Sequence, residues 1–243
     1  MTGDLVFVGD VHLGLGDPEV EAFTSFLEAI APTTVRLVLV GDLFNLWLGR
    51  RELERPHQRF VTAKLATLRR QGIVVRYLEG NRDFRLGPAY AGSVLDDVAG
   101  SGILERQGGK RLYAIHGDLA NRKDFQYRAW RRIARSRLAW TVFNSLPRDR
   151  RLRLAEAVEA RMRRTNTAHK RAFPEQDVRA YAARFLRAGH DAVVLGHFHI
   201  EKDLQAEPPS PPGRVLVLPE WKTSRRHLQV NPRGEIRFVD SPS

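Results

Sequence analysis

Short runs of apolar and β-branched residues alternate along the chain with longer segments of helical periodicity. Runs of this kind are typical of strands that are covered on both faces, and the longer segments are typical of helices. We expect strands at Leu5–Gly9, Val35–Val40, Ile73–Leu78, Leu112–Ile115 and Ala192–Leu195, and helices at Pro18–Ala31, His57–Gln71 and Asp177–Ala188. The alternation predicts a layered α/β domain.

The pattern changes after residue 200, where the helical periodicity ends. Short strand signals follow one another there, interrupted by the loop Pro208-Pro209-Ser210-Pro211-Pro212. Closely spaced strands with turn residues between them are typical of antiparallel pairing. We expect an antiparallel group near Lys202–Ala206, Arg214–Leu218, His227–Val230 and Glu235–Val239.

Positive charge is concentrated in one segment. The net charge is +12, and residues 122–171 hold 16 Lys and Arg against 4 Asp and Glu, so this segment carries the whole excess. Its first part predicts a helix over Arg128–Trp140, with Trp130, Ile133, Ala134 and Leu138 on one face and Arg128, Arg131, Arg132 and Arg135 opposite. We interpret 122–171 as a basic helical insertion, or cap, within a single domain spanning 1–243.

Several classes of protein are excluded or disfavoured. No apolar run approaches the length of about 18 residues that a spanning helix needs. The chain contains no cysteine, which excludes disulfide scaffolds, cysteine zinc sites and thiol nucleophiles. The first residues enter an apolar strand without a basic, cleavable leader, so we expect a cytoplasmic protein.

Asp, His or Asn follows each of the five expected strands. The sequences are Gly9-Asp10-Val11-His12, Gly41-Asp42, Gly80-Asn81-Arg82-Asp83, His116-Gly117-Asp118 and Gly196-His197-Phe198-His199. Functional sites in α/β sheets gather outside the carboxyl ends of the strands, so we expect these loops to converge.

The residue types at these positions indicate a metal site. Carboxylate, amide and imidazole ligands without thiolate suit Mn²⁺, Fe²⁺ or Zn²⁺. Seven candidate ligands exceed what one tetrahedral ion requires and suit two ions that share a bridging carboxylate. Two divalent ions with two aspartates and a hydroxide keep a positive charge, which favours an anionic phosphate ester. Asp83 and Asp118 are expected to orient ligands rather than to bind the ions.

The five motifs together resemble the calcineurin-like metallophosphoesterase superfamily over Asp10 to His199. The resemblance implies an α/β fold, a four-layer α/β/β/α sandwich with the helical insertion attached. It implies that Asp10, His12, Asp42 and His199 hold one divalent ion, and that Asp42, Asn81, His116 and His197 hold the other. The ions would most often be Mn²⁺, and a hydroxide bridging them would attack phosphorus.

Further motifs resemble a narrower family, the UDP-2,3-diacylglucosamine pyrophosphatases of lipid A biosynthesis. They are Gly41-Asp42-Leu43-Phe44, Gly80-Asn81-Arg82-Asp83-Phe84 and Ala160-Arg161-Met162-Arg163, together with a helical insertion after His-Gly-Asp. Arg82 stands where many superfamily members have an acid-donating histidine, and arginine can hold a phosphoryl oxygen but not readily donate a proton. The implied reaction converts UDP-2,3-diacylglucosamine to UMP and 2,3-diacylglucosamine 1-phosphate.

The same resemblance assigns roles to individual residues. It implies catalytic roles for Asn81, Arg82 and His116, and substrate binding by Arg82, Asp124, Tyr127, Asn166, Lys170 and His197. The chain departs from the family pattern near its end, where the family often has a small residue followed by Trp and His, and this chain has Pro219-Glu220-Trp221-Lys222.

Other functions fit parts of this pattern. The same centre could serve a nuclease or another soluble phosphodiesterase, and a scaffold without metal is a third alternative. The basic segment could be a solvated face, a cap that meets an anionic membrane, or a nucleic-acid site, and its aromatic spacing favours packing over base stacking. We expect a monomer that lies peripherally on the cytoplasmic face of the inner membrane, with a UDP-linked glycolipid as substrate and no nucleic-acid partner.

Overall fold

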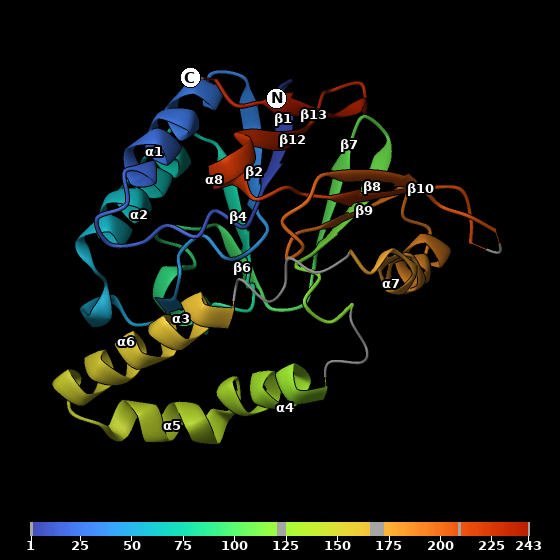
Figure 1. Ribbon diagram of the computed structural model, residues 1–243. Helices are drawn as coiled ribbons and strands as arrows, with labels where there is room; N and C mark the ends of the chain where they lie inside the picture. Colours follow the sequence, from blue (N-terminus) through green and yellow to red (C-terminus); the bar gives the residue numbers. More distant parts are fainter. Residues whose placement is uncertain (1, 121–124, 166–172, 209, 243) are drawn as a thin grey trace.

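The computed structural model describes residues 2–120, 125–165, 173–208 and 210–242, without the side chains of 125–127, 130 and 163–165. Two main sheets form its centre (Figure 1). The first has the order β13-β12-β1-β2-β4-β6, with β1 (Asp4–Val8), β2 (Thr34–Leu39), β4 (Val74–Leu78), β6 (Asp97–Ala99), β12 (Arg226–Val230) and β13 (Ile236–Asp240). The second has the order β10-β11-β9-β8-β7, with β7 (Ile103–Gln107), β8 (Lys110–Ile115), β9 (Ala192–Leu195), β10 (Lys202–Gln205) and β11 (Arg214–Val217).

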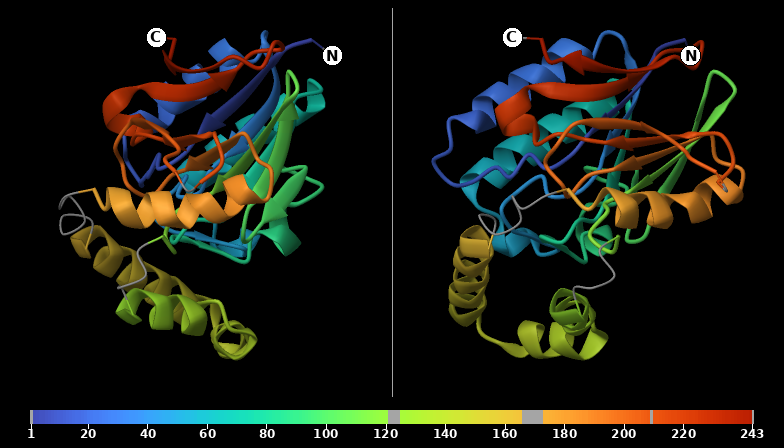
Figure 2. Two further views of the ribbon diagram at one scale, coloured as in Figure 1. Left: turned by 90° about the vertical axis from the view of Figure 1, so that its right-hand side faces the viewer. Right: turned by 45° about the vertical axis from the view of Figure 1, so that its right-hand side comes forward.

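The helices lie outside the two sheets (Figures 1 and 2). Those of the main body are α1 (Glu19–Ile30), α2 (Pro56–Arg70), α3 (Gly87–Tyr90), α7 (Glu175–Arg187) and α8 (Trp221–Ser224), with a 3₁₀ turn at Arg51–Leu53. A short pair, β3 (Trp47–Leu48) with β5 (Asp83–Phe84), completes the strands. No helix among the described residues is both long and apolar enough to cross a membrane.

Alternate side chains of the central strands face different cores, and this explains why strands such as β1 and β9 have long apolar runs. Leu5 and Phe7 of β1 pack into the core between the sheets, whereas Val6 and Val8 pack with α1 and α2 on the other side of their sheet. In β9, Val194 likewise faces the inter-sheet core and Val193 the core beneath α7. A strand with two buried faces shows no polar alternation.

The predicted α/β class is confirmed, and the five predicted strands and three predicted helices are present with small shifts at their ends. The predicted antiparallel group is wrong as a unit. β10 and β11 belong to the second sheet, where β11 runs parallel to β9, and β12 and β13 belong to the first, where β12 runs antiparallel to β1. The short segments alternate in the same way in both sheets, so the sequence pattern does not reveal the change of sheet.

The basic segment is helical and lies to one side of the sheets (Figure 1). Its helices are α4 (Phe125–Ala134), α5 (Arg137–Ser145) and α6 (Arg148–Thr165). A single helix over Arg128–Trp140 is therefore wrong, because Ser136 divides α4 from α5. The Ser136 side chain accepts a hydrogen bond from the backbone N–H of Ala139, which is the usual way in which serine starts a new helix.

His227 on β12 gives the fold a dependence on pH. Its ring packs against Phe26, and burial, together with the charge of Arg226, lowers its pKa to about 4. An unfolded histidine has a pKa of about 6.5, so the unfolded chain takes up the proton first as the pH falls. The contribution of neutral His227 to the free energy of unfolding is therefore complete above pH ~6.5 and is lost as the pH approaches 4.

We therefore expect that lowering the pH from 7 to 5 removes about 2 kcal/mol of unfolding free energy through His227. Urea unfolding of the EDTA-treated chain at both pH values measures this loss. His227→Gln cannot take up the proton. Between the two pH values, its unfolding free energy should therefore fall by about 2 kcal/mol less than that of the unmodified chain. Equal losses in the two proteins would contradict the assignment.

Candidate metal centre

Five loops from the two sheets meet at one place. They follow the carboxyl ends of β1, β2 and β4, which are parallel neighbours in the first sheet, and of β8 and β9, which are parallel neighbours in the second. The expected convergence therefore occurs, but across two stacked sheets rather than along one. The loops carry all seven candidate ligands: Asp10, His12, Asp42, Asn81, His116, His197 and His199.

One cluster joins Asp10, His12 and His199, whose ligand atoms all lie within 4.8 Å of one another. The Nε2 atoms of the two imidazoles are 3.0 Å apart. The Asp10 Oδ1 atom lies 3.6 Å from His199 Nε2 and 3.9 Å from His12 Nε2. Ligand atoms this close to one another can bind a single cation.

A second cluster lies on the other side of Asp42. Asn81 Oδ1 is 2.9 Å from His116 Nε2 and 3.0 Å from His197 Nδ1. Asp42 Oδ1 lies 3.8 Å from His116 Nε2, and Asp42 Oδ2 lies 4.0 Å from His12 Nε2 in the first cluster. Asp42 thus lies near a histidine of each cluster, as a bridging carboxylate would. Asp10 is also close to both, because its ligand atom lies within 4.8 Å of those of Asp42 and His116.

The backbone of these loops is strained at the candidate ligands. Five of them have positive φ angles: Asp10 (52°), His12 (54°), Asp42 (55°), His197 (74°) and His199 (56°). Residues other than glycine are uncommon in this region, and each such residue costs of order 1–3 kcal/mol. Strain of this kind persists only where surrounding structure fixes it, and it concentrates at functional sites.

Asp83 fixes two of the ligand loops, as expected for a residue that orients ligands. Its Oδ2 atom accepts hydrogen bonds from the backbone N–H groups of Asp42 and Gly80 and from the hydroxyl of Tyr77. The Tyr77 hydroxyl in turn accepts one from the N–H of Leu43. Sequence reasoning missed Tyr77, although a tyrosine within an otherwise aliphatic strand end is a signal for such a role.

Burial shapes the protonation of the first cluster. Burial lowers the pKa of His12 well below its ordinary value despite the adjacent Asp10 carboxylate, so the imidazole is neutral and can offer a lone pair. Burial alone would raise the pKa of Asp10, but the nearby His199 imidazole, 3.6 Å from Oδ1, holds that pKa below its ordinary value. A charged carboxylate and a neutral imidazole are the forms that bind a metal ion.

Two further buried acids at the site, Asp42 and Asp83, have raised pKa values. Burial raises the pKa of Asp42, and the charge of Asp10 adds to this effect, while His116 and Arg82 oppose it. Burial and the charge of Asp42 raise the pKa of Asp83 to about 7. The Oδ1 atom of Asp10 is buried and has no hydrogen-bond partner among the described residues. A cation would supply positive charge beside these acids, and the donor set fits a divalent one.

His116 and His199 respond to the same acids. Burial lowers their pKa values, but Asp42 and Asp10 around His116, and Asp10 and Glu220 around His199, raise them above the ordinary value. A bound cation would oppose this upward shift, because a histidine binds a metal through a deprotonated nitrogen. The Nδ1 atom of His116 lies 2.9 Å from the carbonyl oxygen of Val40, which fixes its ring orientation.

Arg82 is buried beside the second cluster. Its backbone N–H donates to Asp42 Oδ1 at 2.9 Å, and its Nε lies 3.5 Å from Asp42 Oδ2. Its Nη1 donates to the carbonyl oxygen of Asn45. These contacts hold the guanidinium next to the Asp42 carboxylate.

The segment in which the chain differs from the family pattern, around Glu220 and Lys222, also lies against the candidate metal site. Glu220 Oε1 is 3.6 Å from His199 Nδ1, and Lys222 donates to the carbonyl oxygen of His12 and pairs with Asp17. Sequence reasoning noticed Glu220 and Lys222 only as differences from a family pattern and gave them no place in the site.

Four predicted substrate-binding residues fall outside what the structure describes. Asp124, Asn166 and Lys170 lie outside the described residues, and Tyr127 is described only as part of the α4 backbone. Arg82 and His197 are the two predicted substrate contacts whose side chains are described, and both lie at the metal centre.

The fold and the site define a calcineurin-like phosphoesterase. The model of this family matches residues 4–201, and the chain belongs to the family. The predicted class, a metal-dependent hydrolase of phosphoric esters, is thereby confirmed.

Curated relatives with one name extend over nearly the whole chain. UDP-2,3-diacylglucosamine hydrolase of Ralstonia nicotianae is 33% identical, over 99% of this chain and 91% of its own length. The proteins of the same name from Tolumonas auensis and Yersinia pestis are 28% and 29% identical, over 98% and 93% of this chain and 96% and 94% of their own lengths. The resemblance to this narrower family is thus found at full length.

A solved structure entitled a novel archaeal phosphodiesterase has the same fold. It aligns with a TM-score of 0.51 over 97% of this chain and 98% of its own length, at 10% identity.

Proposed function

We propose that the chain hydrolyses the diphosphate bond of UDP-2,3-diacylglucosamine, giving UMP and 2,3-diacylglucosamine 1-phosphate. The observation that carries the proposal is the position of Asp42 between two clusters of metal-binding side chains. The full-length similarity to proteins named UDP-2,3-diacylglucosamine hydrolase supports this substrate.

Two divalent cations, Mn²⁺ in this proposal, occupy the clusters. Asp10, His12, Asp42 and His199 hold one of them, and Asp42, Asn81, His116 and His197 hold the other. When bound, such a pair supplies Lewis acidity and makes water a nucleophile near neutral pH. Every ligand comes from one chain, so the site needs no second copy, and we propose that the enzyme acts as a monomer.

The protein's own contribution is to position the substrate and to neutralise its charge. Arg82 stays protonated near neutral pH and binds a phosphoryl oxygen beside the bridging carboxylate. Asn81 and His116, whose side chains meet at 2.9 Å, orient the reacting phosphate from the other side. His197 contributes a further substrate contact, and Asp124, Tyr127, Asn166 and Lys170 extend the substrate site into the cap.

The test is a substrate assay with the purified chain and Mn²⁺. We expect release of UMP from UDP-2,3-diacylglucosamine, and loss of that activity after treatment with EDTA. A chain that leaves this substrate intact but rapidly cleaves bis-p-nitrophenyl phosphate or DNA would overturn the substrate assignment. It would then be a nuclease or another soluble phosphodiesterase with the same centre.

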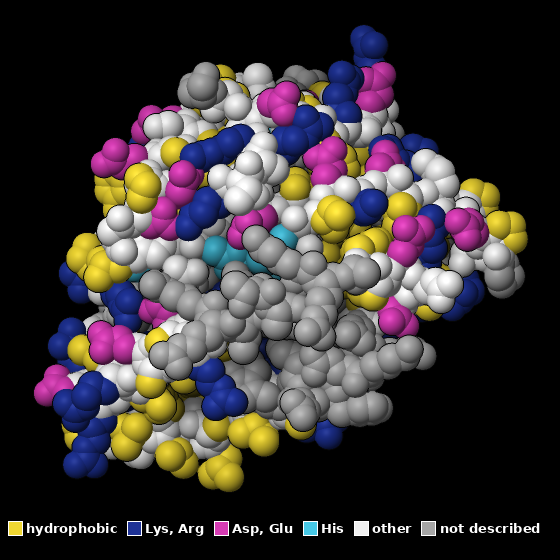
Figure 3. Space-filling model, in the orientation of Figure 1, with side chains coloured by type: hydrophobic (Ala, Val, Ile, Leu, Met, Phe, Trp, Pro, Cys, Tyr) yellow, Lys and Arg dark blue, Asp and Glu magenta, His cyan; other side chains and the backbone are white. Residues whose placement is uncertain are grey.

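The cap offers a surface that suits an anionic bilayer, and we propose that it docks the enzyme peripherally on the cytoplasmic face of the inner membrane. Ile133, Leu138 and Val142 are 64%, 74% and 55% exposed on α4 and α5. Figure 3 shows hydrophobic side chains with Lys and Arg beside them along this lower edge of the molecule. Apolar side chains can enter the headgroup region while each nearby basic residue contributes about 1 kcal/mol.

This proposal predicts that Ile133→Ser with Leu138→Ser weakens binding to vesicles of phosphatidylglycerol and phosphatidylethanolamine by about 10-fold or more, because two apolar side chains no longer leave water. Co-sedimentation measures the binding. Leu104→Ser removes an exposed leucine of β7, outside the cap, and should bind as the unmodified chain does. Equal binding by the cap variant would contradict the proposal.

A further inference from the structure

Two buried carboxylates lie on the loops that carry candidate metal ligands. Glu79 directly precedes Gly80 and Asn81, and Asp118 follows His116 by two residues. They are only 8% and 6% exposed. A buried carboxylate is costly unless a partner of opposite charge compensates it. The positive partners of Glu79 and Asp118 therefore help to fix the position of these loops.

The cap supplies positive partners for both carboxylates. Arg131 Nε lies 2.6 Å from Asp118 Oδ2, and Arg135 Nη1 lies 3.4 Å from Glu79 Oε2. Arg131 lies on α4, and Arg135 directly follows the last residue of this helix, where its N–H still donates to the carbonyl oxygen of Arg131. Residues four apart in such a turn lie on the same side. One face of the cap thus reaches a loop of each sheet.

Arg135 also holds the backbone of a ligand loop directly. Its Nη2 donates to the carbonyl oxygen of Gly80 at 2.5 Å and to that of Asp83 at 3.3 Å. The Gly80 carbonyl belongs to the peptide group that joins Gly80 to Asn81. Arg135 therefore restrains the orientation of the residue that contacts both His116 and His197.

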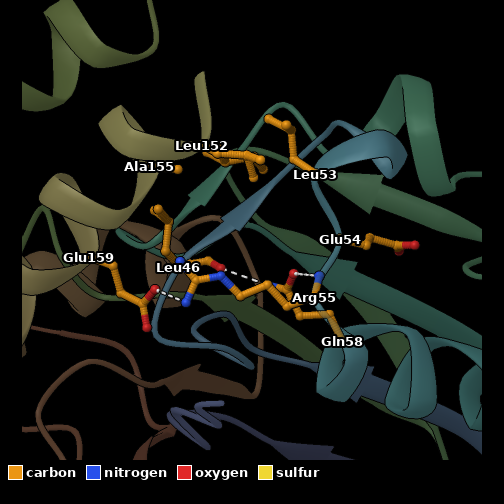
Figure 4. A pocket seen from close by; sticks show the side chains of 9 residues that line it. Leu46, Leu53, Glu54, Arg55, Gln58, Leu152, Ala155 and Glu159 are labelled. Atoms are coloured by element: carbon orange, nitrogen blue, oxygen red, sulfur yellow. Dashed lines mark hydrogen bonds and ion pairs between the residues drawn. The ribbon is translucent and has the colours of Figure 1, made fainter. Parts of the chain in front are cut away.

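The third helix of the cap is attached to the same region. Arg82 Nη2 donates to the carbonyl oxygen of Met162 on α6 at 3.3 Å. About one turn earlier in α6, Glu159 Oε2 lies 2.8 Å from Arg55 Nη1 of the main body. This ion pair lies beside a pocket lined by Leu46 and Leu152 (Figure 4). The ion pair anchors α6 near the ligand loops.

We propose that Arg131 and Arg135 are positioning residues for the metal centre, so that the cap contributes to cation binding and turnover independently of any lipid that it contacts. Arg135 holds the Asn81 loop, and Arg131 holds the His116 loop. This inference rests on the dimetal part of the proposed function and not on the glycolipid substrate. The basic face of α4 is thus partly turned inward, toward the acids of the body.

The experiment uses the full chain without lipid, so that substrate contacts of the cap play no part. Calorimetric titration of Mn²⁺ gives the cation affinity, and hydrolysis of bis-p-nitrophenyl phosphate gives kcat and KM separately. We expect Arg135→Ala to weaken Mn²⁺ binding and to lower kcat, each by about 10- to 100-fold, with little change in KM, as for residues that orient metal ligands. Arg131→Ala should act in the same direction.

Two further variants make the test specific. Arg135→Lys keeps the charge beside Glu79 but loses the forked donors, so it should restore part of the Mn²⁺ affinity. Arg132→Ala removes an exposed arginine of α4 that has no hydrogen bond or ion pair with the described side chains, and it should behave as the unmodified chain. Should the alanine variants unfold, Arg135→Lys and Arg131→Lys carry the comparison, with partial loss of Mn²⁺ affinity as the expected result.

Unchanged Mn²⁺ affinity and unchanged kcat in folded Arg135→Ala and Arg131→Ala would overturn the inference while leaving the proposed function intact. The unmodified chain, measured alongside, reports on the proposed function itself. If it neither binds Mn²⁺ nor cleaves the ester, both the dimetal centre and this inference are wrong.

Discussion

Asp42→Ala is expected to lower kcat/KM by about 10³-fold or more, the largest loss of any single ligand substitution. The carboxylate lies between the two clusters, within 4.0 Å of both His12 and His116. Its removal takes a negative charge from between two cations and leaves them to repel each other. A loss of several kcal/mol of electrostatic stabilisation corresponds to a rate effect of this size. Steady-state hydrolysis with saturating Mn²⁺ measures it.

The matched control separates the charge of Asp42 from its backbone conformation. Asp42 has a φ angle of 55°, a region in which alanine is strained and asparagine is tolerated. Asp42→Asn keeps this conformation and an oxygen for the N–H of Arg82, but it lacks the charge. It should lose nearly as much activity as Asp42→Ala, whereas Asn81→Ala should lose less because it affects one cluster only. Near-normal turnover in Asp42→Asn would contradict the bridging role.

Gly80→Ala is expected to disrupt the centre without removing any ligand. A Cβ atom at this position would lie 2.2 Å from Asp42 Oδ1 and 2.9 Å from His116 Cε1. These atoms cannot remain in place, so the bridging carboxylate and the imidazole must move apart. Overpacking of this kind costs about 1–3 kcal/mol, and we expect Mn²⁺ affinity to fall by roughly 10-fold or more.

Gly87→Ala is the control for this prediction. A Cβ atom there would approach nothing closer than Val98 Cβ at 4.0 Å, an ordinary contact. This variant should bind Mn²⁺ as the unmodified chain does. If Gly80→Ala also binds Mn²⁺ normally, the close packing around Asp42 is not required for cation binding.

The sequence predicted that the candidate ligands would converge because their positions follow from a simple rule. Each candidate ligand lies just after a short apolar strand, and the carboxyl ends of neighbouring parallel strands share one edge of a sheet. The strands themselves were identifiable because both of their faces are buried, which leaves continuous apolar runs such as the one around Phe7.

The sequence did not predict how these strands divide between two sheets. Val215 and Leu228 lie in similar short apolar runs, yet one belongs to the sheet of β9 and the other to the sheet of β1. Pairing partners far apart along the chain leave no local signal. The five motifs already indicated the family, whereas the coordinates were needed to assign each strand to its sheet.

The cap shows a second kind of limit. Its arginines were expected to lie opposite an apolar face, and helical periodicity alone cannot say which face meets the body. In the structure, Arg131 and Arg135 meet buried acids of the body while Ile133 and Leu138 are exposed. The acids that attract these arginines are distant in sequence, so the pattern within the helix could not reveal the orientation.

The most direct test of the account is the anomalous difference map of a crystal grown with Mn²⁺. We predict two peaks about 3.5–4 Å apart, with an Asp42 oxygen on each. One peak should lie among Asp10, His12 and His199, and the other among Asn81, His116 and His197. A single peak, or peaks that these side chains do not contact, would contradict the dimetal centre.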